Sequence, residues 1–339
     1  MSTISLPAIP KFSVHVPSRP MMARDADSMF WTSRYIERAE HVARLLLVNA
    51  NLLIDVGDLA PKLLSQHWQS VLTIMRTEPP AGGVEGTKDM GARIAHYMTF
   101  DRDNANSLLT CVSRARENAR GIRENISAEM WEALNTLYWS IRGDDAPSRF
   151  EESPDDFYRQ LMTGSMLFQG LTDQTLDHDQ RWLFTQVAKY LERIDVTCRV
   201  IETKYNILQS GAGQMDAALK NIQWMAVLRS CCSIEAYRRH HLGEMDPLRV
   251  ATFLVLERNF PRSVRYAVGM AREALCSIRN ETSGLAIDPA ERLLGRLNAQ
   301  LEYAEPSEVM KEGIPTYVQK IQAQVAEAGL EVQKRYFLY

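Results

Sequence analysis

The stretch "RYIERAEHVARLLLVNANLL" at residues 34–53 combines a helical apolar repeat with a cluster of charges near its start. A second stretch, "KYLERIDVTCRVIETKYNIL" at residues 189–208, has the same design. Aligned at an offset of 155 residues, the two share six identical residues in twenty pairs. Average residue usage would give roughly one such identity. The alignment therefore indicates that one helix occurs twice in the chain.

The similarity continues downstream with one additional residue of offset. "ARENARGIR" at 115–123 matches "AREALCSIR" at 271–279. At the same offset of 156 residues, four further positions are identical in pairs: Trp68 and Trp224, Leu72 and Leu228, Ala95 and Ala251, and Ser107 and Ser263. An offset that holds over this length predicts two diverged copies of one helical unit. With two copies, a closed body with pseudo-twofold symmetry is favoured over an open solenoid.

The pattern predicts an all-α fold. Ser153-Pro154, Asp246-Pro247 and Asp288-Pro289 each combine a capping residue with a proline at the first helical position, which is typical of helix starts. No convincing alternating strand pattern is found. We expect a flexible arm, a first repeat, a linker with a connecting helix, a second repeat and a C-terminal helix, at residues 1–20, 21–145, 146–174, 175–305 and 306–339, respectively.

The charged residues of the two matching helices lie on one side of a helical wheel, opposite the apolar residues. A solvated face is the ordinary interpretation of such a stripe, since exposed ion pairs contribute little to stability. Retention of both Glu and Arg in two diverged copies instead favours a partly buried ion-pair network or a ligand-facing groove. Both interpretations stay open. The predicted polar residues are Glu37, Arg38, Glu40, Arg44, Glu192, Arg193, Asp195 and Arg199, together with the repeated Arg-Glu steps Arg116-Glu117 and Arg272-Glu273.

A metal site is the sharper alternative for the first helix. Glu37, Glu40 and His41 have carboxylates and an imidazole at helical spacing, as in di-iron helical bundles. The second copy has Val196 where the first has His41, and nearby arginines would repel a dication. We therefore predict neither a metal nor a cofactor.

Composition excludes several functional classes. The 339-residue chain has a net charge of −3, which gives no broad positive field for nucleic acid. No apolar run reaches the length of a membrane span, and residues 1–20 lack the apolar run of a signal peptide. Five cysteines without a CxxC or CxxxC pair favour reduced, buried thiols and a cytoplasmic location.

Four stretches resemble the bacterial alpha-E family, which is named for its helical fold and its Glu-Arg motif. They are "MMARDADSMFWTSRYIERAEHVARLL" (21–46), "ARENARGIRENISAEMWEALNTLY" (115–138), "YLERIDVTCRV" (190–200) and "DPLRVATFLVLERNFPRSV" (246–264). The resemblance covers essentially the whole chain from Met21. It implies that the family's Glu-Arg positions are Glu37-Arg38 and Glu192-Arg193.

The resemblance also implies partners. Alpha-E proteins are encoded beside, or fused to, a circularly permuted ATP-grasp-like protein, often with a transglutaminase-like peptidase. We therefore expect an accessory or co-catalytic helical partner of an ATP-grasp-type ligase in amide or peptide bond formation or peptide modification, with an amino-acid or peptide group as a candidate ligand. Two alternatives stay open: an enzyme in its own right, either a helical transferase or a metal-dependent oxidoreductase, and a purely structural oligomerisation module.

Overall fold

The structure is a computed structural model of the chain. It describes residues 21–56, 61–83, 89–210, 217–241, 245–281 and 287–338. The predicted N-terminal arm, residues 1–20, lies outside the described residues. Within them the structure is all-helical and contains no strand, as predicted.

The described residues form fifteen α-helices and one 3-10 turn, η2 (Arg123–Asn125). Their bounds are α1 (Ala23–Val56), α2 (Pro61–Met75), α3 (Met90–Phe100), α4 (Leu108–Gly121), α5 (Ala128–Arg142), α6 (Ala146–Glu152), α7 (Pro154–Thr175), α8 (Gln180–Ser210), α9 (Ala217–Ser230), α10 (Ile234–His240), α11 (Pro247–Leu256), α12 (Val264–Glu281), α13 (Pro289–Tyr303), α14 (Pro306–Glu312) and α15 (Ile314–Tyr336).

The predicted helix starts are correct. Helices α7, α11 and α13 begin at Pro154, Pro247 and Pro289. The side chain of Asp246 accepts a hydrogen bond from a backbone N–H of the first turn of α11, and Asp288 does the same for α13. These carboxylates satisfy donors that a helix start leaves without intrahelical partners.

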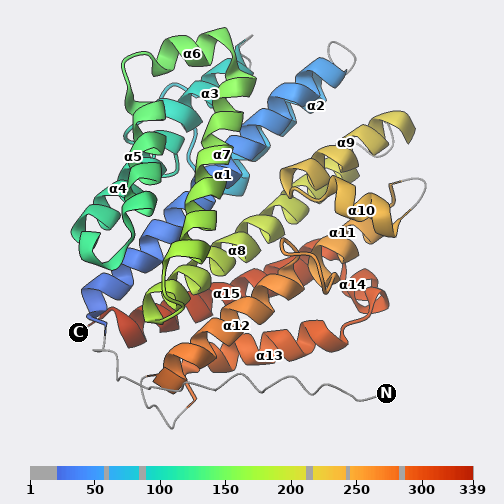
Figure 1. Cartoon of the computed structure of the whole chain (residues 1–339). Helices are drawn as coiled ribbons and strands as arrows, with labels where there is room; N and C mark the ends of the chain where they lie inside the picture. The colour runs from blue at the N-terminus through green and yellow to red at the C-terminus, as the bar shows by residue number, and fades with distance from the viewer. Residues whose placement is uncertain are drawn as a thin grey trace, which may run out of the picture.

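The two long helices that carry the repeated charge cluster, α1 and α8, lie side by side through the centre of the molecule (Figure 1). Helices α4 and α7 pack on α1, and α5 packs on these two helices. Likewise α12 and α15 pack on α8, and α13 packs on these two helices. The helix that follows each central helix contacts both central helices: α2 packs on α1 and α8, and α9 packs on α8 and α1. Both central helices are therefore enclosed on nearly all sides.

The segments 146–174 and 306–339, which the sequence analysis separated from the repeats, have the same helix order. Each contains a short helix (α6 or α14) followed by a long one (α7 or α15). Helix α7 packs along α1, and α15 packs along α8. These segments are thus integral parts of the two helix groups.

Two helix ends 156 residues apart have the same strained backbone. Arg76 after α2 and Cys232 after α9 are the non-glycine residues with positive φ in the described part of the chain, at 50° and 54°. In each turn the N–H of the next residue donates to the carbonyl five residues back, at 2.9 Å after α2 and 2.8 Å after α9. Such turns satisfy free carbonyls at a helix end.

The starts of α4 and α12 also match. The hydroxyls of Ser107 and Ser263 donate to a carbonyl six residues back, at 2.6 Å and 2.5 Å. Each hydroxyl accepts the N–H three residues ahead, at 3.1 Å and 3.2 Å. The aligned positions of the sequence therefore have the same local structure at these two places.

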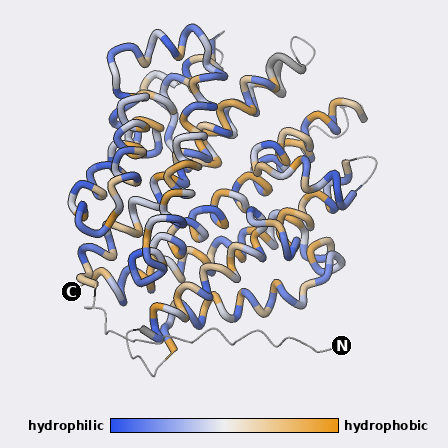
Figure 2. The backbone as a smooth tube through the Cα atoms, in the orientation of Figure 1, coloured by the Kyte–Doolittle hydropathy of each residue, from blue (hydrophilic) through white to orange (hydrophobic). Residues whose placement is uncertain are grey.

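The apolar side chains form one large core. Ile36 and Leu46 of α1 and Ile194 of α8 are fully buried in a cluster that includes residues of both helix groups. Polar and apolar residues alternate along the outer helices (Figure 2), as expected for helices with one buried stripe. Among the described residues, no helix has the length and apolarity needed to cross a membrane.

Candidate functional site

The Glu-Arg steps of the two central helices bind each other. Arg193 donates from Nε to Oε1 of Glu37 at 2.7 Å and from Nη2 to Oε2 at 3.0 Å. Arg38 donates from Nε to Oε1 of Glu192 at 2.7 Å and from Nη2 to Oε2 at 3.0 Å. The glutamate of each Glu-Arg step thus pairs with the arginine of the other step, which makes two bidentate ion pairs. This geometry matches the planar guanidinium to the carboxylate, which a lysine could not reproduce.

Each glutamate of these pairs has further donors. Gln169 of α7 donates from Nε2 to Oε2 of Glu37 at 2.6 Å. Nε2 of His41 lies 3.3 Å from Oε1 of the same carboxylate, but the geometry is not that of a hydrogen bond. Arg34 donates to Oε2 of Glu192 at 2.8 Å. Both carboxylates are completely buried, so they depend on these donors in place of water.

Glu40 forms a second centre one turn along α1. Its Oε1 accepts from Nε of Arg44 at 2.9 Å, and Arg44 Nη2 donates to the same oxygen. Arg262, in the loop before α12, donates to Oε2 at 3.0 Å. Glu40 is fully buried between two cations, so this centre carries a net positive charge.

Asp195 occupies the matching place on α8. Arg199 donates from Nη2 to Oδ2 of Asp195 at 2.9 Å, and its Nη1 donates to the carbonyl of Ile74 at the end of α2. The more exposed Arg76 lies 3.7 Å from Oδ1. Helix α2 is thereby tied to α8.

The pKa values of the buried carboxyls follow from competing effects. Burial by itself would raise the pKa of Glu37, but the charges of Arg193 and Arg262 hold it well below its usual range. Arg38 and Arg34 likewise outweigh the burial of Glu192 and lower its pKa. For Glu40, Arg262 and Arg44 lower the pKa to about 2. All three groups are charged near neutral pH.

The remaining predicted residues lie outside this network. Arg116 of α4 donates to Oδ1 of Asn135 at 2.7 Å and pairs with Glu117, which also pairs with Arg120. Arg272 and Glu273 are exposed on α12. Arg116 is half-buried against α5, and the other three residues of the repeated Arg-Glu steps are exposed. The expectation that these steps join the central network is therefore not met.

A buried cationic cluster lies further along the two helices and was not identified from the sequence. Lys204 of α8 is 2% exposed, and its Nζ lies 2.7 Å from Nδ1 of His67 and 3.4 Å from Oδ1 of Asn49. Burial lowers the pKa of Lys204 to about 7, and burial together with the charge of Lys204 lowers the pKa of His67 well below its usual range. The cluster joins α1, α2 and α8.

Replacing Lys204 tests this burial through pH dependence. Between pH 7 and 10.5 the unfolded state binds more protons than the folded state at this residue, so stability rises with pH. We expect the unfolding free energy of wild type, relative to Lys204→Met, to increase by about 3 kcal/mol from pH 7 to pH 9.5. Urea unfolding of both proteins at the two pH values measures it. Parallel pH profiles would show that Lys204 is solvated.

A metal site has the required ligand types. One ligand atom each from Glu37, Glu40 and His41 lies within 4.8 Å of the others. However, the two carboxylates already pair with Arg193, Arg44 and Arg262. Because these five charged groups sum to +1, a dication would have to displace guanidinium groups or join an excess of positive charge.

We therefore expect purified protein to hold well under stoichiometric iron, manganese or zinc, since the carboxylates are occupied. Elemental analysis of wild type and His41→Ala measures this. Near-stoichiometric metal that disappears in His41→Ala would contradict the ion-pair interpretation and support a metal enzyme.

Three network residues were missed by sequence reasoning. Arg34 and Gln169 carry no distinguishing local pattern, and Arg262 in "NFPRSV" resembles a residue that flanks a helix cap. The alignment places Asn106 opposite Arg262, and Asn106 accepts from Nη1 of Arg38 at 3.2 Å. The available signal was that Asn106 and Arg262 are both polar and both lie just before an aligned helix start. Helices α4 and α12 begin beside the central helices, so these two residues reach the network.

Comparison with known proteins agrees with the helical fold and the Glu-Arg steps. Residues 21–337 match the family Alpha-E, described as a predicted alpha-helical domain with a conserved ER motif. The chain belongs to the Alpha-E family. The matched region spans nearly the whole Alpha-E chain, including both central helices and all residues of the buried network.

Curated relatives of this Alpha-E protein occur in mycobacteria. An uncharacterized protein of Mycobacterium bovis is 23% identical over 301 residues, which cover 84% of the present chain and 33% of the relative. Uncharacterized proteins of two Mycobacterium tuberculosis strains match to the same extent. The chain thus spans about a third of the length of these relatives. No solved structure matches the chain.

Proposed function

We propose that this Alpha-E protein is an accessory helical module of an ATP-grasp-type ligase that forms amide or peptide bonds or modifies peptides. The observation that carries the proposal is the engagement of both Glu-Arg steps in bidentate pairs within the protein. A carboxylate held by two guanidinium nitrogens and with a lowered pKa is a poor general base at neutral pH. In this proposal the Glu-Arg steps stabilise a helical binding module, and the partner protein carries the catalytic residues.

The length of the mycobacterial relatives supports the proposal that the Alpha-E region functions together with another domain. The Alpha-E region occupies about a third of the mycobacterial proteins, so in them it is joined to a much longer chain. We propose a circularly permuted ATP-grasp-like protein as the partner here, with a transglutaminase-like peptidase as a second partner, and a cytoplasmic location. These partners follow from the family resemblance.

We further propose that the fold is an internal duplication with pseudo-twofold symmetry. The reciprocal pairs support it, because an isologous contact places residue i against j and j against i. The matching turns at Arg76 and Cys232, and the matching caps at Ser107 and Ser263, support it as well. The likeness of α6–α7 to α14–α15 extends the proposed units to about residues 21–175 and 180–336.

A second function, a metal-dependent enzyme, is favoured by the closeness of Glu37, Glu40 and His41. Its test is the metal analysis described above. A purely structural oligomerisation module remains the third alternative, and it predicts a stable homo-oligomer with no effect on any ligase.

Co-expression tests the proposed role. The tagged Alpha-E chain is purified after co-expression with the ATP-grasp-like protein of the same organism, and ATP consumption is measured with candidate amino acids. We expect co-purification and an ATPase rate at least about tenfold above that of the ATP-grasp-like protein alone, a difference of about 1.4 kcal/mol in activation free energy. A ligase that neither binds the chain nor changes its rate would contradict the proposal.

A further inference from the structure

A pocket of about 530 Å³ opens between α1, α7, α9 and α10. Its volume is in the range of small-molecule sites. Its apolar wall comes from α1, α7, α9 and α10, and its polar residues include three arginines and one glutamate. The apolar residues are Leu47, Val48, Leu52, Met162, Ile222 and Ile234, and the charged residues are Arg44, Arg159, Arg229 and Glu235.

Arg44 is the best-fixed cation of this pocket. Its side chain is 9% exposed, and Glu40 holds its Nε and Nη2. Its Nη1 makes no hydrogen bond to any residue that the structure describes. Because Glu40 also pairs with Arg262, the charge of Arg44 is not fully neutralised. A rigid donor on a partly uncompensated cation therefore lines the pocket.

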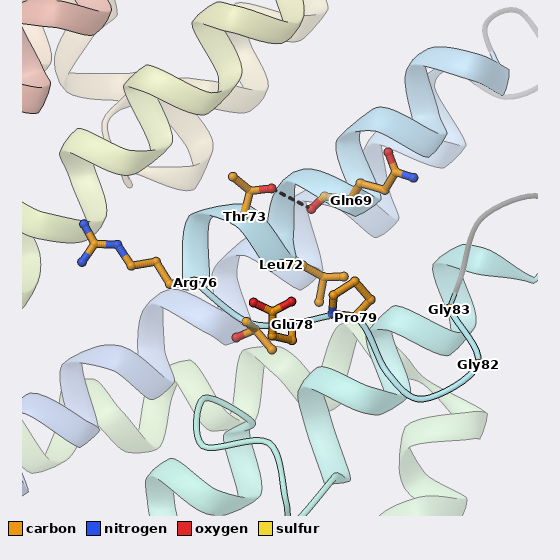
Figure 3. Close-up of a pocket in the computed structure, with 9 residues that line it drawn as sticks. Gln69, Leu72, Thr73, Arg76, Glu78, Pro79, Gly82 and Gly83 are labelled. Carbon is orange, nitrogen blue, oxygen red and sulfur yellow. Dashed lines mark hydrogen bonds between the residues drawn. The ribbon is translucent and has the colours of Figure 1, made fainter.

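At the aligned place in the other helix group, the matching guanidinium has no unused end. There Arg199 uses Nη1 on the carbonyl of Ile74, and Arg76 extends over Asp195. A cavity of about 620 Å³ opens at this place too, but Arg76 lines it and Arg199 does not. In Figure 3, Arg76 reaches from its wall toward the adjacent helix. In the alignment, Cys232 takes the place of Arg76. The side chains of Arg44 and Arg199 are equally buried, at 9% and 8% exposed, so the two places differ in the unused Nη1 of Arg44 and in the short Cys232 in the pocket lining.

The residues that line the two places also differ between the helix groups. In the second group, Gln319 and Gln322 of α15 donate to the carboxylate of Glu202 on α8, at 2.6 Å and 3.4 Å, and bridge the two helices. When α7 is matched with α15 from their first residues onward, the corresponding positions in the first group are Arg159, Met162 and Leu47. These three residues line the pocket and form no such bridge. The place in the first group thus combines an apolar lining with a guanidinium that has an unused donor.

We infer that this pocket binds a small organic carboxylate with an apolar body, such as the C-terminal end of an apolar peptide. The carboxylate meets Arg44 Nη1, and the apolar side chains contact Leu47, Leu52 and Ile222. A charge-assisted hydrogen bond to a fixed guanidinium supplies selectivity for the anion. This binding rests on the isolated chain, so it stands or fails independently of the proposed ligase partner.

Acetyl-Leu-Leu with a free carboxylate is the probe, and the same dipeptide with a C-terminal amide is its control. By calorimetry we expect a Kd below about 1 mM for the carboxylate and at least about tenfold weaker binding of the amide. The structure describes all five cysteines: three are buried, Cys276 is half-buried and Cys232 is exposed, so the prediction that all five are buried is wrong at Cys232 and Cys276. We expect saturating carboxylate, but not amide, to slow iodoacetamide labelling of Cys232, mapped by mass spectrometry.

Two variants localise the site. Cys232→Arg places an arginine where the other group has Arg76, and although it adds a cation we expect it to weaken carboxylate binding at least about tenfold. Arg76→Cys is the matched control, and its carboxylate affinity is expected to stay within about twofold of wild type. The side chain of Arg159 is 61% exposed, so Arg159→Gln does not threaten folding. We expect this variant to weaken carboxylate binding about threefold and to leave the affinity for the amide unchanged. Equal binding of both dipeptides, absence of binding, or undiminished binding by Cys232→Arg or Arg159→Gln would overturn the inference.

Discussion

Glu37→Gln is expected to lower the free energy of unfolding by about 3–5 kcal/mol, because it leaves the buried guanidinium of Arg193 without its counter-charge. Glu37 is fully buried, and Arg193 is nearly so. Glutamine has a similar volume, so the loss reports the charge and the bidentate geometry and not a cavity. Urea or thermal unfolding at pH 7 measures the change.

Glu117→Gln is the matched control. Glu117 pairs with two arginines, but its side chain is 51% exposed, so its removal is expected to change stability by less than about 0.5 kcal/mol. Equal, small effects of both substitutions would show that the central pair is solvated, as a surface stripe would be.

Acid is expected to unfold the protein as the pH falls from about 4.5 to about 2. The pKa values of Glu37, Glu40 and Glu192 are lowered in the folded state, so the unfolded state binds more protons below pH 4.5. The stability from each group is complete above its unfolded pKa and is lost through this window. Glu40 alone, with a pKa lowered from 4.5 to about 2, accounts for about 3 kcal/mol, and Glu37 and Glu192 act in the same direction.

Circular dichroism across pH titrations at several urea concentrations gives the number of protons taken up on unfolding. We expect about three for wild type below pH 4 and about one fewer in Glu192→Gln. Stability that is constant from pH 4.5 to pH 2.5 would mean that these carboxyls have ordinary pKa values and lie in water.

The sequence was sufficient for the helical fold and for several helix starts. Proline after a capping acid determines local geometry, which is why α11 and α13 begin at the predicted residues. The retained Glu and Arg also indicated the correct pair of helices. A short-range signal is enough for these features, because each depends on neighbours within one or two turns.

The partners of the charges could not be predicted. A helical wheel shows that Glu37 and Arg38 share a polar side, but whether that side faces water or another helix depends on packing over more than 150 residues. Gln169 and Arg262 reach the network from α7 and the loop before α12. Sequence spacing alone does not place such contacts, and the open pocket beside Arg44 depends on the same tertiary packing.

The central claim is that two buried reciprocal pairs, one of them between Glu37 and Arg193, hold the two helix groups together. A double-mutant cycle with Glu37→Gln, Arg193→Gln and the double variant tests it most directly, with unfolding free energies measured at pH 7. The account predicts a coupling energy of about 2–3 kcal/mol, so that the second substitution adds little to the first. Additive effects, with a coupling below about 0.5 kcal/mol, would contradict it.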